Sequence, residues 1–308
     1  MNYNDKISLR KTCSSIGFMV FASAVLLHII PYSMSIISGI FRINPLSATL
    51  EPIISCIDSI VSLFIVGAIY CKLSSSDMSK LVPVSRVKPK LLCCFVLITL
   101  TVSFISSYMT DILLDNLSFI GISSKSFVDI DSGDGFSVLL QIISVAVVPA
   151  LVEEFMFRGI ILHKLLPYGT TFAILVTTIL FAMLHGNIVQ IPFAFVGGLA
   201  MAFSVVKTNS LLPSIISHFF INLLSVYLDA AKYYEVPTDI NNTIYFILLF
   251  VVVLGGVLSA FILSSNKDLF KTNLSKYKFR ECMGVCFSSV GIIFTGIFLI
   301  IRTVNYTL

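Results

Sequence analysis

The sequence predicts an all-α, polytopic transmembrane helical bundle of about eight or nine spans. Two properties support this class: 57% of the 308 residues are hydrophobic and only 12% are charged, whereas a soluble domain normally contains roughly 25% charged residues. Long apolar stretches also alternate with short polar loops, which is the pattern of a chain that crosses a bilayer repeatedly. The net charge of +4 is spread over the loops, so we expect no nucleic-acid partner.

A spanning helix needs about 20 mostly apolar residues, and we take the candidate segments in chain order. They are 16–41, 53–71, 91–109, 137–162, 170–188, 190–206, 210–228, 242–265 and 283–301. The apolar run after the polar, basic N-terminus is too long for a cleaved secretory signal, so we expect the first span to be retained. The spans divide the chain into N-terminal helices with an external loop (1–135), a central helical core (136–228) and C-terminal helices (229–308).

The distribution of basic residues predicts the orientation of these spans. If the N-terminus is cytoplasmic, nearly all lysines and arginines lie on the inner side, and the external exceptions are Arg42, Lys125, Lys232 and Arg302. This asymmetry follows the positive-inside rule. We therefore expect a multi-pass protein of the cell membrane with its N-terminus in the cytoplasm.

Three ionisable residues stand close together in the apolar run "PALVEEFMFRGIIL" (149–162). Such residues are costly inside a membrane and are therefore candidates for function. Glu154 and Arg158 are four residues apart, so they share a helix face and can form an ion pair. A structural salt bridge would explain this pair, but not Glu153, which points about 100° away around the helix.

Two later spans supply further polar side chains. "LFAMLHGN" places His185 one turn after Phe181, and "SIISHFFINLL" places His218 and Asn222 on one helix face. His28 and Asp58 also lie within early spans, where we interpret them as structural. The combination of two acids, two imidazoles and an amide within 70 residues of apolar sequence suggests hydrolysis.

A carboxylate in a low-dielectric pocket is suited to act as a general base toward water. Glu153 would take the proton, His185 would help to hold the water, and His218 with Asn222 would stabilise the oxyanion. Alternatively Glu153, His185 and His218 would bind a divalent metal such as zinc, whose familiar ligands include two histidines and a glutamate. The sequence lacks an HExxH motif and leaves both routes open.

At these residues the chain resembles the CPBP family of intramembrane proteases, which includes the type II CAAX prenyl endopeptidases and bacteriocin-processing enzymes. The family motifs EExxxR, FxxxH and HxxxN match Glu153 to Arg158, Phe181 to His185 and His218 to Asn222, in that order. The resemblance covers about 136–228, which would be the catalytic core. It implies that Glu153 is the base, that Glu154 pairs with Arg158 to order the site, and that His185 positions the water.

The resemblance also implies membrane-associated peptide or protein substrates, reached from the cytoplasmic side of the bilayer. The composition of the spans is that of a bacterial protein, where prenylated substrates are not expected. Bacteriocin maturation, signal-peptide processing and self-immunity are then the candidate roles. The alternative is a non-catalytic protein, either an immunity factor that binds a peptide or a transporter with a buried Glu/His proton relay.

One geometric difficulty follows from the predicted spans. Glu153 lies near the inner end of its span, whereas His185 lies late in a span that begins inside. The two side chains reach the same depth only if the helix predicted at 170–188 begins above the membrane or is steeply tilted.

Overall fold

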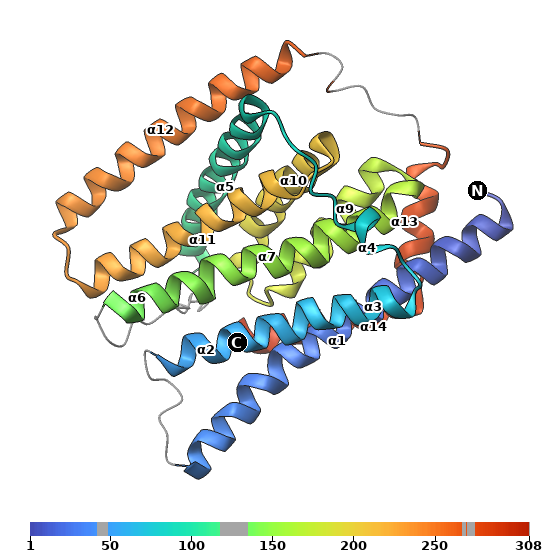
Figure 1. The fold of residues 1–308 in the computed structure, drawn as a ribbon, viewed down its shortest axis with the longest axis horizontal. Helices are drawn as coiled ribbons and strands as arrows, with labels where there is room; N and C mark the ends of the chain where they lie inside the picture. Colours follow the sequence, from blue (N-terminus) through green and yellow to red (C-terminus); the bar gives the residue numbers. More distant parts are fainter. Residues whose placement is uncertain (42–48, 118–134, 267–268, 270–274, 308) are drawn as a thin grey trace.

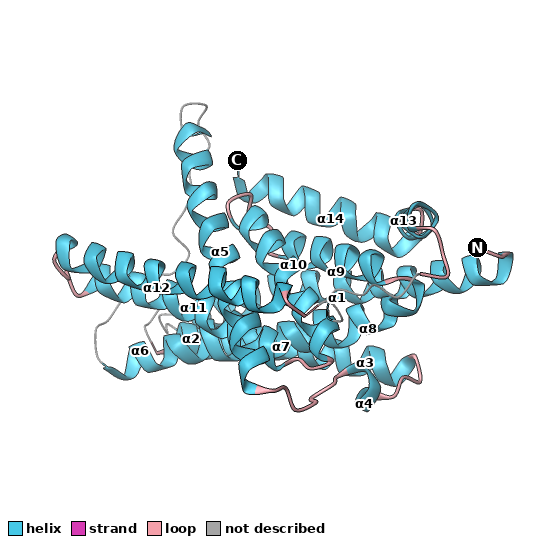
Figure 2. Cartoon of the chain, turned by 90° about the horizontal axis from the view of Figure 1, so that it is seen from above, coloured by secondary structure: helices cyan, strands magenta, loops and turns pink. Residues whose placement is uncertain are grey.

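A computed structural model describes residues 1–41, 49–117, 135–266, 269 and 275–307 of the chain. These residues form helices packed into a bundle, seen from two directions in Figures 1 and 2. Within the described part the only β-type pairing is an isolated antiparallel bridge between Val84 and Ser210. The predicted all-α class is confirmed. Most of the predicted external loop (118–134) lies outside the described residues.

Along the chain the helices form an N-terminal, a central and a C-terminal group. The N-terminal group comprises α1 (Tyr3–Phe41), α2 (Leu50–Ser59), η1 (Ile60–Ile65), α3 (Val66–Leu73), α4 (Met78–Leu81) and α5 (Pro89–Leu117). The central group comprises α6 (Gly135–Gln141), η3 (Ile142–Val147), α7 (Val148–Glu154), η4 (Phe155–Ile161), α8 (Leu162–Leu165), η5 (Leu166–Tyr168), α9 (Thr170–Leu184), α10 (Gln190–Thr208) and α11 (Leu212–Tyr233). The C-terminal group comprises α12 (Thr238–Ser264), α13 (Phe279–Phe287) and α14 (Val290–Thr307).

Seven helices in the described residues are long and apolar enough to cross a membrane, or eight if α13 and α14 form one span bent by 71°. The chain is therefore a polytopic membrane protein. The helix predicted at 170–188 ends at Leu184, and its 15 residues rise only about 22 Å, which is short of the roughly 30 Å hydrocarbon core. The prediction of a full span there was wrong, because a continuous apolar run does not reveal where the helix stops.

Segments far apart in the sequence meet at one end of the bundle. The Leu211 amide donates to the Pro83 carbonyl at 3.0 Å, and the Ser275 hydroxyl donates to the Tyr168 carbonyl at 3.1 Å. The N-terminal amine contacts Glu281 at 3.0 Å. The segments predicted to be cytoplasmic thus share one end. That this end faces the cytoplasm remains a prediction.

Glycines allow the helices to approach closely. A Cβ atom on Gly17 of α1 would lie 2.3 Å from the backbone of Gly291 in α14, and the Thr295 hydroxyl donates to the Gly17 carbonyl at 2.6 Å. Gly197 of α10 lies similarly close to the Ser103 side chain of α5. Glycines at such positions let helix backbones approach closely within a bilayer. Helices associate there through close packing, because the hydrophobic effect does not favour contact between helices over contact with lipid.

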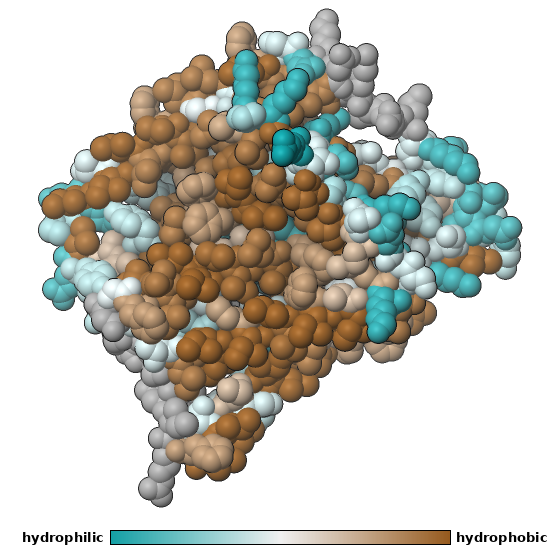
Figure 3. Space-filling model, viewed as in Figure 1, coloured by the Kyte–Doolittle hydropathy of each residue, from teal (hydrophilic) through white to brown (hydrophobic). Residues whose placement is uncertain are grey.

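The exterior of the bundle is largely apolar. In Figure 3 hydrophobic residues cover the middle of the visible face, while hydrophilic residues gather near the N-terminus and along the upper edge. α12 illustrates this surface, because Phe250, Leu254, Val257 and Phe261 are all exposed. Such residues are favourable against lipid chains and unfavourable in water.

Candidate active site

The helix that carries the two glutamates runs continuously from Gly135 to Tyr168 but changes to π-helical winding on both sides of them. α7 holds Glu153 and Glu154 and lies between two π-helical segments, η3 and η4. π-helical turns widen the backbone and leave carbonyl groups available to side chains, and they are frequent at functional sites. The continuous helix predicted over 137–162 is confirmed, but hydrophobic periodicity does not distinguish an α from a π turn, so the π-helical segments were not predicted.

Glu154 and Arg158 form a completely buried ion pair. Arg158 Nη1 donates to Glu154 Oε1 at 2.8 Å, and neither side chain has any exposed surface. Arg158 Nη2 also donates to the Gly198 carbonyl of α10 at 3.3 Å, and the guanidinium carbon lies 4.0 Å from the centre of the Phe181 ring. The guanidinium is therefore held by residues of three helices, α7, α10 and α9.

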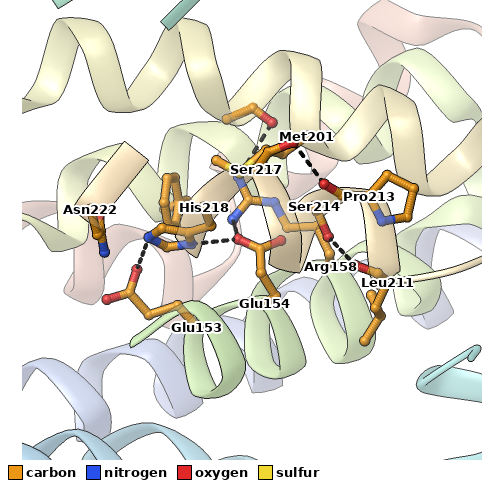
Figure 4. Close-up of polar contacts among 12 residues, drawn as sticks. Glu153, Glu154, Arg158, Met201, Leu211, Pro213, Ser214, Ser217, His218 and Asn222 are labelled. Atoms are coloured by element: carbon orange, nitrogen blue, oxygen red, sulfur yellow. Dashed lines mark hydrogen bonds and ion pairs between the residues drawn. The ribbon is translucent and has the colours of Figure 1, made fainter. Parts of the chain in front are cut away.

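His218 connects the ion pair to the second glutamate. Its Nδ1 lies 2.9 Å from Glu154 Oε1 and its Nε2 lies 3.8 Å from Glu153 Oε2 (Figure 4). The Glu154 oxygen also accepts from Arg158, so the carboxylate is ionised and His218 Nδ1 is the donor. The imidazole thus stands between the paired carboxylate and Glu153.

Glu153 differs from its neighbour in its surroundings. Its side chain keeps 20% of its surface exposed, whereas Glu154 is fully buried. The His218 ring lies 3.8 Å from its carboxylate, beyond normal hydrogen-bond distance. One carboxylate of the pair is bonded to Arg158, and the other remains partly exposed.

Phe181 brings the two histidines together. Its ring centre lies 5.0 Å from that of His185 and 5.9 Å from that of His218, in edge-on arrangements. His185 Nδ1 lies 3.0 Å from the Phe181 carbonyl, which can only accept, so this nitrogen carries the proton. In neutral His185 the Nε2 lone pair is consequently free to accept a hydrogen bond from water.

His185 also belongs to the site through Phe181, whose ring lies against both histidines and the Arg158 guanidinium. It follows the last residue of α9, the helix that stops part-way along the bundle. The contacts of Phe181 place His185 close to His218 and Arg158, so the helices bring these side chains to the same level of the bundle.

Asn222 lies one turn after His218 on α11, as expected from the spacing. Its amide nitrogen donates to the Val145 carbonyl of η3 at 2.9 Å. The side-chain amide has a second N–H, so this bond fixes the amide without using all of its donors. The oxyanion role predicted for Asn222 stays a prediction.

Two residues have contacts at the site that the sequence did not predict: His163, and Gly198, which was expected only to allow close helix packing. His163 Nδ1 lies 2.8 Å from the Arg158 carbonyl and 3.0 Å from the Gly159 carbonyl, which are backbone groups of the π-helical η4. Gly198 provides room for Arg158, because a Cβ there would lie 3.2 Å from Nη2 and 3.0 Å from Thr178. The i+5 spacing of His163 from Arg158 was the available signal, but it is meaningful only in a π turn.

The predicted metal ligands have suitable chemistry. Zinc-bound histidines commonly donate their second ring N–H to a carboxylate or a carbonyl, as His218 does to Glu154 and His185 to Phe181. However, among the described residues no group of three or more His, Cys, Asp or Glu side chains is arranged to hold one ion. The donors thus do not converge on one position, and no catalytic step is assigned to a metal here.

A family model described as Rce1-like, type II CAAX prenyl endopeptidase, matches residues 135–224. The match covers α6 to the middle of α11 and contains every side chain of the site described above. Comparisons with curated proteins and with solved structures found no match.

Proposed function

We propose that this chain is an intramembrane endopeptidase in which Glu153 activates water, a proposal supported by the match of residues 135–224 to a family model described as Rce1-like, type II CAAX prenyl endopeptidase. The observation that carries the proposal is the division between the two adjacent glutamates. Glu154 is buried against Arg158, while Glu153 is partly exposed beside His218, and His185 lies against the same Phe181 ring as His218. The family supports a CAAX-type protease in general, and the catalytic type is our proposal.

The proposed reaction begins with a water held between Glu153 and His185. Both the carboxylate and the free Nε2 of His185 are acceptors, so they bind the two hydrogens of the water. The oxygen lone pairs then face the scissile carbonyl. Glu153 takes one proton as the oxygen attacks, and the resulting acid returns it to the leaving amine.

The negative charge of the tetrahedral intermediate needs donors on the opposite side. The second N–H of Asn222 is one such donor, and His218 provides another through Nε2 when its ring is protonated. Glu154 and Arg158 contribute indirectly: they fix His218 from its Nδ1 side and leave Nε2 directed toward the reacting groups.

We propose membrane-associated peptides as substrates, since the site lies inside a bundle with an apolar exterior. Within this class the trimming of bacteriocin or signal peptides and the destruction of a toxic peptide in self-immunity use the same chemistry. Each requires cleavage of a backbone amide near the bilayer.

The test is cleavage by the purified full chain in lipid vesicles containing candidate membrane peptides, read by mass spectrometry with and without a chelator. Glu153→Gln should lower the rate by about 10²–10⁴-fold, as expected for loss of a general base. Glu235→Gln, which changes an exposed glutamate, is the matched control. The proposal is wrong if Glu153→Gln cleaves within tenfold of the unmodified chain.

The cleavage assay with added chelator tests whether the reaction requires a metal ion. The geometry described above predicts that chelation leaves the rate unchanged. A loss that is restored by added zinc would instead assign Glu153, His185 and His218 as ligands, and the water would then be activated by the ion.

A further inference from the structure

An arginine from the C-terminal helix lies beside the turn that carries His185. Arg302 Nη1 of α14 donates to the Leu184 carbonyl at 2.7 Å. Leu184 is the last residue of α9, and His185 follows it directly. Arg302 lies outside the segment matched by the family model, and it was assigned to an external loop by the predicted span 283–301. α14 continues past that predicted span to Thr307, so Arg302 lies within the helix, and its external side stays a prediction.

The carbonyl groups at the C-terminal end of α9 need hydrogen-bond donors, and a positively charged donor is favourable there. The last carbonyls of a helix lack intrahelical donors, and they form the negative end of its dipole. The His185 and Gly186 amides satisfy the carbonyls of Ala182 and Met183. The Leu184 carbonyl receives the Arg302 guanidinium, whose charge complements the helix end.

Arg302 contacts the turn on both sides of His185. Gly186 has φ +63°, and a Cβ there would lie 2.7 Å from Arg302 Nε and 2.9 Å from its guanidinium carbon. The guanidinium therefore packs against the Gly186 backbone while it bonds to Leu184. The residue enclosed between these two contacts is His185.

The helix that carries Arg302 is firmly placed. α14 packs on α1 through the Gly17–Gly291 contact and the Thr295 bond to Gly17. Arg302 also acts electrostatically on Asp58, a buried acid of α2 that accepts a 2.8 Å bond from Ser62. A charged side chain within an apolar helix is costly unless it has such partners.

We propose that Arg302 is a positioning residue for His185. It fixes the 184–186 turn and thereby the direction in which His185 Nε2 points into the site. This inference rests on the proposed hydrolysis for its effect on rate, but the position of the His185 ring is measurable without any substrate.

The experiment compares Arg302→Met, which removes charge and donors, with Arg302→Lys, which keeps them. Arg280→Met changes an exposed arginine at the start of α13 and is the matched control. We expect Arg302→Met to lower kcat by about 10–100-fold with little change in KM, because small misplacements of a catalytic group have large effects on rate. Arg302→Lys should recover most of the loss, and Arg280→Met should have no effect.

The second readout is the ¹⁵N spectrum of the histidine rings in the folded chain. The sequence has only four histidines, so the His185 signal is assigned by its absence in His185→Ala. In Arg302→Met the His185 signal should shift or broaden, whereas those of His163 and His218 should not. His28 also lies near the charge of Arg302 and is excluded from the comparison.

These readouts separate the two proposals. An unchanged His185 signal in Arg302→Met, or an unchanged kcat, overturns the positioning role. Absence of peptide cleavage by the unmodified chain would count against the proposed protease, while the shift of the ring signal would still report the contact. If Arg302→Met does not fold, Arg302→Gln replaces it: it removes the charge and the guanidinium that packs on Gly186, so a smaller loss of kcat and a smaller shift of the His185 signal are expected, and no change in either overturns the positioning role.

Discussion

Replacing Arg158 with alanine should destabilise the protein severely. The guanidinium and the Glu154 carboxylate are both fully buried, and their nitrogen and oxygen atoms are 2.8 Å apart. Coulomb's law with an effective dielectric constant of about 20 gives roughly 6 kcal/mol for two charges at this separation. Part of this is offset because burying Arg158 is itself costly. Measured losses for breaking such a pair are about 3–5 kcal/mol.

Most of the lost stability arises because Glu154 remains buried and charged without its cationic partner. In Arg158→Ala the Glu154 oxygen keeps its bond to His218 but loses its cationic partner. The Gly198 carbonyl and the Phe181 ring lose contacts at the same time. Since native proteins are stable by only about 5–15 kcal/mol, we expect much less folded protein in the membrane.

The assay is the free energy of unfolding in detergent micelles, together with the yield of monodisperse protein. Glu153→Gln preserves side-chain shape at a partly exposed position, so its change should stay within about 1 kcal/mol. The double variant Arg158→Met with Glu154→Gln removes both charges and should recover part of the loss. Equal stability of Arg158→Ala and Glu153→Gln would refute the reasoning.

Two further substitutions test other parts of the site. Gly198→Val places atoms where Arg158 and Thr178 already lie, so stability should fall by about 1–3 kcal/mol, whereas Gly296→Val, which meets open space, should cost much less in the same unfolding assay. Asn222→Ala should lower kcat by about 10²–10³-fold if its free N–H contacts the oxyanion, with stability reduced by about 1 kcal/mol for the lost bond to Val145. A kcat within threefold of the unmodified chain would remove Asn222 from the reaction.

The sequence predicted the local part of this site well. The pairing of Glu154 with Arg158 follows from i, i+4 spacing, and the structure shows it at 2.8 Å. The convergence of α7, α9 and α11 was inferred because isolated polar groups in apolar helices need one another. The contact of His218 with both glutamates is in keeping with that inference.

The features that escaped prediction depend on backbone geometry or on distant partners. The π-helical turns around α7 leave no trace in hydrophobic periodicity, so the role of His163 was not visible. The early end of α9 is hidden in a continuous apolar run. Arg302 lies 118 positions from its partner Leu184, and no local pattern links them.

The Phe181 ring contacts the guanidinium of Arg158 on its face and the two histidines at its edges. One aromatic side chain therefore touches the group that stabilises the fold and the groups assigned to the reaction. A change in its size or tilt would disturb both at once, so neither property can be adjusted independently at this position. Engineers seeking altered selectivity should leave this ring intact and vary the outer helices instead.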